Sequence, residues 1–201
     1  MVSRPDTWSE TAKVAIAAQS GSDVHFDTIT ETVDVDIGNK DFDVIATLGG
    51  GRLVKFTPQE PTTITLEAYP LDAGTDSGTT GEGFFDLMNS SDTSQPVVVS
   101  ADRERNKYRI AIMWTTDTAS TTYAESQVAS PTQACMRVVA ADGFFTSVKP
   151  SYTDGVLKFT ITYKVPPFDK SGNANLKIES IDGSATATLT ALASYTSTTK
   201  W

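Results

Sequence analysis

Apolar and polar residues alternate along several short segments of the chain, the period of two that is typical of β-strands with one buried face. The clearest segment runs from Val156 to Lys164. Leu157, Phe159, Ile161 and Tyr163 occupy one face of this predicted strand, and lysines and threonines occupy the other. The segment therefore predicts a half-buried strand.

The same alternation, or a shorter β-branched run, predicts strands elsewhere in the chain. They are expected at residues 13–18, 32–37, 42–48, 52–57, 62–69, 96–100, 107–115, 135–140, 175–181 and 185–192. The turn signal Asp154-Gly155 predicts a hairpin or strand entry over residues 147–164. About eleven short strands separated by turn residues predict a mainly β fold, either a sandwich or a barrel.

One segment has a different pattern. Residues 81–89, with the sequence GEGFFDLMN, cluster their apolar side chains at helical spacing between two loops rich in Gly, Ser, Thr and Asp. We expect one short flanking helix near residues 82–89.

The 201 residues show neither an internal repeat nor a composition shift that would mark a domain boundary. We expect a single domain over residues 1–201, with an N-terminal arm at about 1–10. The polar stretch 116–132 is expected to be a long loop or arm.

The chain has one cysteine, Cys135, and one histidine, His25. A disulfide framework and a Cys/His zinc site are therefore excluded, and we expect His25 in a loop or on the surface rather than in a catalytic triad. No run of eighteen apolar residues indicates a membrane span, and the first ten residues do not have the pattern of a secretion signal.

The net charge of −9 opposes specific binding of nucleic acid, because an acidic surface repels phosphates. The negative charge is consistent with solubility in general, and it is also consistent with a surface that faces DNA without binding it.

Asp34, Asp36, Asp41 and Asp43 surround Gly38-Asn39, an arrangement that loosely resembles a calcium-binding loop. The expected bidentate glutamate is absent, and Asp34 and Asp36 share one face of a predicted strand. We expect no metal and no cofactor, and interpret these aspartates as solvated or channel-facing charges.

Gly49, Gly50 and Gly51 precede Arg52 in a glycine-rich loop. A phosphate cradle would need a following helix, whereas a strand pattern follows here, so we expect a tight turn between two strands.

Trp114 lies on the apolar face of a predicted strand and is expected in the core, while Trp8 and Trp201 lie near the chain ends. These tryptophans could stack on sugars, but aromatic residues on terminal arms favour burial against another subunit. Arg103 and Arg105 belong to a charged run that fits either a solvated turn or ion pairs with a neighbouring subunit.

The segment KDFDVIATLGGGRLVKFTPQEPTTITLEAYPLDAGT, followed by a polar loop and GFFDLM, resembles the tail tube proteins of tailed phages and tailed archaeal viruses. The matching elements are the strand with Asp43, the turn at Gly50–Arg52, the strand at Ile64–Pro70, and the loop that leads into the short aromatic helix. With the compatible later strands, the resemblance covers about two-thirds of the chain.

The resemblance implies a non-enzymatic virion protein with a β-sandwich or barrel and one flanking helix. Copies would form hexameric rings through inter-subunit β-sheet, and stacked rings would form the tail tube that carries the genome into the host cell. The partners that the resemblance implies for this protein are further copies of the same chain, the terminator, baseplate or tip and tape-measure proteins of the tail, and DNA that passes through the tube. The implied location is the viral tail, assembled in the host cytoplasm, and Asp34 and Asp36 are candidates to face the channel.

Two other functions stay open. A carbohydrate-binding or adhesive β-sandwich, secreted or on a surface, would be a monomer with exposed aromatic side chains. A β-rich hydrolase would need two carboxyl groups brought together in a cleft, one with a raised pKa.

Overall fold

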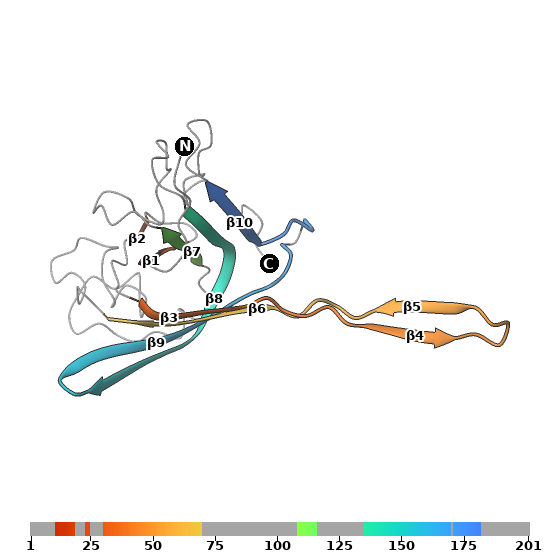
Figure 1. Ribbon diagram of the computed structural model, residues 1–201, viewed down its shortest axis with the longest axis horizontal. Helices are drawn as coiled ribbons and strands as arrows, with labels where there is room; N and C mark the ends of the chain where they lie inside the picture. Colours follow the sequence, from red (N-terminus) through yellow and green to blue (C-terminus); the bar gives the residue numbers. More distant parts are fainter. Residues whose placement is uncertain are drawn as a thin grey trace, which may run out of the picture.

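The computed structural model describes residues 11–18, 23–24, 30–69, 108–115, 135–169 and 171–181, and all regular structure within these ranges is β. An eight-stranded sheet in the order β2-β1-β7-β8-β9-β6-β3, with β10 also paired to β8, forms the body. A separate two-stranded ribbon, β4-β5, extends from it (Figure 1). The expected mainly β fold is confirmed.

The strands, in chain order, have the following bounds. They are β1 (Thr11–Ala18), β2 (Asp23–Val24), β3 (Thr30–Asp36), β4 (Phe42–Ala46), β5 (Arg52–Phe56), β6 (Thr62–Ala68), β7 (Tyr108–Thr115), β8 (Cys135–Thr153), β9 (Val156–Val165) and β10 (Leu176–Ile181).

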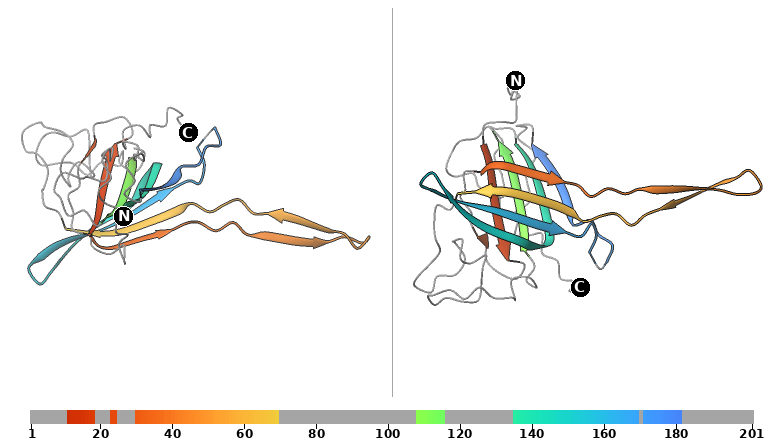
Figure 2. Two further views of the ribbon diagram at one scale, coloured as in Figure 1. Left: turned by 45° about the horizontal axis from the view of Figure 1, so that its top comes forward. Right: turned by 90° about the horizontal axis from the view of Figure 1, so that it is seen from below.

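The long strand β8 belongs to both layers of the body. Its first half, residues 135–140, pairs with β7 on one side and with β10 on the other. Its second half, residues 144–153, pairs with β9. The sheet thus curls over itself, and β1, β7 and β10 cross β3, β6 and β9 steeply, as in orthogonal sheet packing (Figure 2).

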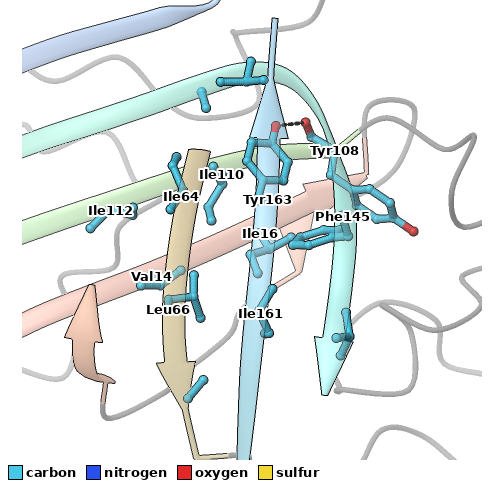
Figure 3. Close-up of a cluster of buried hydrophobic side chains, with 14 of the residues drawn as sticks. Val14, Ile16, Ile64, Leu66, Tyr108, Ile110, Ile112, Phe145, Ile161 and Tyr163 are labelled. Atoms are coloured by element: carbon cyan, nitrogen blue, oxygen red, sulfur yellow. Dashed lines mark hydrogen bonds between the residues drawn. The ribbon is translucent and has the colours of Figure 1, made fainter. Parts of the chain in front are cut away.

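The core lies between these two layers. Rows of side chains that face each other across paired strands fill it, because residues directly opposite in an antiparallel pair share a face. One row joins Val35, Ile64, Tyr163 and Phe145 on β3, β6, β9 and β8. From the other layer, buried residues that include Val14, Ile16, Ile110 and Ile112 complete the cluster (Figure 3).

The predicted strands that fall within the described residues are all confirmed, with two differences of detail. Residues 135–140 and the hairpin entry near residue 147 belong to one continuous strand, β8. Leu157, expected in the apolar face, is 43% exposed because β9 begins beyond the edge of the core.

Several expectations lie outside the described residues. They are the helix near residues 82–89, the strands at 96–100 and 185–192, the N-terminal arm at about 1–10 and the polar stretch 116–132.

Candidate assembly surfaces

The outer layer of the body, formed by β3, β6, β9 and the second half of β8, presents a polar face away from the core. Its side chains form rows in the same register as the core rows, for example Asp34, Thr65, Thr162 and Ser147. We call this surface the polar face. It consists of Thr32, Asp34, Asp36, Thr63, Thr65, Glu67, Ser147, Lys149, Ser151, Lys158, Thr160, Thr162 and Lys164.

Acidic and basic groups are separated across the polar face. Asp34 and Asp36 stand on β3 at one side, and Lys149 stands on β8 at the other. In the middle of the face, Lys158 Nζ lies 2.6 Å from Glu67 Oε2, with both side chains about one-third exposed. The face is therefore not uniformly acidic, since its carboxylates lie toward β3 and its lysines toward β8 and β9.

The polar face ends at two unpaired strand edges. Among the described residues, no strand pairs with the outer side of β3, and none pairs with residues 144–153 of β8 on the side away from β9. Each edge presents backbone N–H and C=O groups that can accept another strand. These edges are the first candidate assembly surface.

The ribbon β4-β5 continues β3 and β6 far out from the body (Figure 2). The connection is ordered by backbone bonds from Thr57 N to Asp41 O at 2.9 Å and from Glu60 N to Asn39 O at 3.0 Å. Gly38 is required there, because a Cβ atom would lie 2.1 Å from the Glu60 carbonyl oxygen. The arm is thus a defined extension of the sheet.

A tight turn closes the far end of the arm, as the glycine-rich loop predicts. Gly50 adopts a positive φ of 78°, and its N–H donates to the Thr47 carbonyl at 3.0 Å. The sequence continues into β5 rather than a helix, so the loop does not form a phosphate cradle.

The arm exposes apolar side chains on both faces. On one face, Phe42 lies opposite Phe56 and Val44 lies opposite Val54, and all four side chains are at least half exposed. The tip residue Leu48 is fully exposed. A two-stranded ribbon is marginally stable in water, and apolar surface of this kind marks a binding surface. The arm is the second candidate assembly surface.

A smaller apolar group lies at the β8-β9 turn, at the opposite end of the outer layer from the arm (Figure 1). Tyr152, Val156 and Leu157 are 73%, 48% and 43% exposed there. Two ends of the same layer thus carry uncovered apolar side chains.

The four aspartates considered as metal ligands are arranged as follows. Asp34 and Asp36 project from the polar face, the Asp41 carboxylate accepts the Phe42 N–H at 2.8 Å, and Asp43 lies opposite Lys55 on the arm. In the described ranges, no group of three or more His, Cys, Asp or Glu residues is placed to hold a metal ion.

Trp114 is half-buried and packs against the core cluster, as expected. His25, Trp8, Trp201, Arg103 and Arg105 lie outside the described residues. Across the part of the chain that the structure covers, no helix has the length and apolar character needed to cross a membrane.

Sequence reasoning did not single out Lys149 or the apolar residues of the arm. Lys149 and Pro150 stand together inside a β-segment, and lysine and proline are both typical of edge strands. That pair was the available signal for a free edge on β8. The arm strands carry apolar residues on both faces, as strands buried on both sides do, so no local signal showed that these residues are exposed.

No family model matches the chain, and no curated protein matches it. The fold is similar to that of chains in solved structures, three of which are described below. A chain of the anti-feeding prophage cap (AFP tube terminating cap) is 13% identical, with a TM-score of 0.46, over 84% of this chain and 89% of that one.

The other two come from PVC, an extracellular contractile injection system, in its extended state. A chain of the sheath-tube complex is 17% identical, with a TM-score of 0.43, over 84% of this chain and 89% of that one. A chain of the sheath/tube terminator is 19% identical, with a TM-score of 0.42, over 89% of this chain and 99% of that one.

Proposed function

We propose that this protein is a structural, non-enzymatic subunit of a viral tail tube. Six copies would form a ring through β-sheet pairing, and rings would stack into a hollow tube that conducts the genome into the host cell. This proposal combines the sequence resemblance at residues 40–88 with the two assembly surfaces.

The observation that carries the proposal is the pair of free edges on one sheet. Successive antiparallel pairings from β3 through β6 and β9 to β8 make β3 and the second half of β8 run in opposite directions. A second copy in the same orientation therefore places its β3 antiparallel to β8 of the first. Repetition around an axis pairs both of these edges in every copy, so neither is left open to aggregation.

The arm supports stacking of such rings. Its apolar side chains, among them Phe42, Val44 and Phe56, reach beyond the body and have no cover within the described residues. In a stacked assembly, copies in the same or an adjacent ring would bury them. Burial of apolar surface contributes about 25 cal/mol per Å², so the arm would supply much of the stacking free energy.

The polar face would line the channel. It offers hydroxyls, carboxylates and lysines, with Glu67 and Lys158 already paired to each other. Because no continuous basic stripe is present on this face of the described strands, DNA phosphates would meet no strong binding surface. Asp34 and Asp36 would then face the channel, as the resemblance implies.

The further partners in this proposal are the terminator, baseplate or tip and tape-measure proteins of the tail. Assembly would take place in the host cytoplasm and the protein would remain in the virion tail.

Negative-stain electron microscopy and sedimentation velocity of the purified chain test the proposal. Rings or tubes of constant diameter are the expected result. A uniform monomer at concentrations matching those inside an assembling virion would contradict the proposal and favour a monomeric binding module.

A further inference from the structure

The two free edges of the outer layer carry opposite charge. On the polar face, Asp34 and Asp36 project from the β3 edge and Lys149 projects from the β8 edge, and these three side chains are exposed. Exposed side chains at an edge contact any strand that pairs there. The sign of their charge therefore affects whether a β3 edge pairs with a β8 edge or with another β3 edge.

We propose that ion pairs between Asp34 or Asp36 of one copy and Lys149 of the next select pairing between unlike edges. This inference rests on the proposed function, and it identifies the groups that direct ring closure. The partner is a second copy of this chain in the same orientation.

Pro150 limits where the incoming strand can pair. Proline has no N–H and is tolerated beside β9 only where its nitrogen faces the free edge. A ladder with an incoming β3 therefore lacks a donor at residue 150. The stretch 144–149 is uninterrupted by proline and comparable in length to β3, and Lys149 stands at its end.

The register of this ladder brings the charges together. Because the polar face must stay continuous, registers differ by steps of two residues. A β3 strand laid along residues 144–149 places Lys149 opposite Thr32 with Asp34 at the diagonal position, and a shift by two residues places Lys149 opposite Asp34. Directly opposite Cβ atoms are about 4.5–5.5 Å apart and diagonal ones about 7–8 Å, both within reach of a lysine. Each of these registers places Lys149 beside at least one aspartate.

Pairing between like edges is disfavoured by the same groups. If two β3 edges paired, Asp34 and Asp36 of one copy would lie beside the same aspartates of the other copy. If two β8 edges paired, the Lys149 side chains would repel each other, and the Pro150 residue of each copy would lack an N–H donor. Like-edge pairing closes a two-fold dimer, whereas unlike-edge pairing leaves one edge of each kind and continues to a ring. The charge division thus favours rings over dimers.

Two complementary variants test the inference. Lys149→Glu makes both edges acidic, and the double substitution Asp34→Lys/Asp36→Lys makes both edges basic. For each variant alone, the protein concentration at half assembly should be at least about tenfold higher than for wild type, because like charges then face each other at every junction between subunits. An equimolar mixture should form rings of wild-type size at wild-type concentration, with the two variants alternating.

Lys164→Glu is the matched control, since Lys164 is exposed on the same face but belongs to β9, whose two edges are both paired. This variant should assemble like wild type. Circular dichroism of each dissociated variant checks that the fold is retained, and sedimentation velocity with negative-stain microscopy gives the readout.

The outcomes separate the two proposals. If wild type assembles and Lys149→Glu assembles equally well, or if mixing fails to restore rings, the edge-charge inference is wrong while the tube proposal stands. If wild type itself remains monomeric, the tube proposal is wrong and this inference with it.

Discussion

Gly143 lies where β8 passes against the ring of Tyr163, next to the point where the strand leaves one layer and enters the other. A Cβ atom on Gly143 would lie 2.5 Å from both Cζ and the hydroxyl oxygen of Tyr163, and 2.6 Å from the Lys164 carbonyl oxygen. The Tyr163 hydroxyl donates a 2.6 Å hydrogen bond to the Tyr108 carbonyl on β7. These residues join both layers at the bend of β8 (Figure 3).

Gly143→Ala should destabilise the dissociated chain by about 1–3 kcal/mol, because the added methyl group overpacks a filled site. Gly49→Ala is the control, since no atom lies within 4 Å of a Cβ at that position. Urea denaturation of both variants measures the difference. Equal stability of Gly143→Ala and wild type would show that Tyr163 does not pack against β8 as described.

Tyr163→Phe should lower the free energy of unfolding by about 1–3 kcal/mol at neutral pH, because the buried Tyr108 carbonyl loses its donor. Tyr152→Phe, on a side chain that is 73% exposed, should leave stability unchanged. Denaturant unfolding of the two variants gives the comparison, and a similar small effect of both would contradict the buried hydrogen bond.

The pH dependence gives a second test of Tyr163. Burial, and secondly the nearby charge of Asp142, raises the pKa of the Tyr163 phenol well above its ordinary value of 10.0. The unfolded chain then loses this proton at lower pH than the folded chain, so the contribution to stability is complete below pH 10 and is lost as pH rises further. Unfolding free energies measured from pH 8 to 11 should fall less steeply for Tyr163→Phe than for wild type.

At the scale of elements, alternation predicted where strands lie but not what each strand contacts. Both β9 and β4 show apolar residues at a period of two, yet Ile161 is fully buried while Val44 is 51% exposed. The difference comes from tertiary context: β9 is paired on both sides within the body, whereas β4 pairs only with β5 beyond it. The local sequence does not indicate whether a strand lies within the body or beyond it.

The bend in β8 illustrates the same limit. The sequence predicted separate strand segments at 135–140 and near 147, because Ala141, Asp142 and Gly143 interrupt the apolar pattern. In the structure these residues continue the strand through a register shift between Phe145 and Ser147. Such a bulge lets one strand turn from one layer into the next without a loop.

Amide hydrogen exchange tests the role of the arm. In the dissociated chain, amides of β4 and β5 should exchange rapidly, because a solvated two-stranded ribbon opens easily. Assembly should slow them by at least about tenfold, while amides of β6 and β9 stay slow in both states. Unchanged exchange in assembled particles would show that the arm remains in solvent and does not take part in stacking.

At the scale of the whole molecule, sequence reasoning reached the fold class and identified Asp34 and Asp36 as exposed charges on one strand face. Apart from the Lys149-Pro150 pair, no local pattern marked the edges, because a strand is an edge only when no other strand pairs with one of its sides. Lys149 acquires its proposed role only because no strand among the described residues pairs with the second half of β8 on the side away from β9. Pairwise strand order is a long-range property that a local period of two does not specify.

The central claim is that the β3 edge of each copy is completed by residues 144–153 of β8 in its neighbour. A cryo-electron microscopy map of the assembled particle, at a resolution that separates strands, tests it most directly. We predict one continuous antiparallel barrel in which β3 and β8 of adjacent copies are hydrogen-bonded. Particles in which these two edges face solvent, or are covered by segments of their own chain, would contradict the claim.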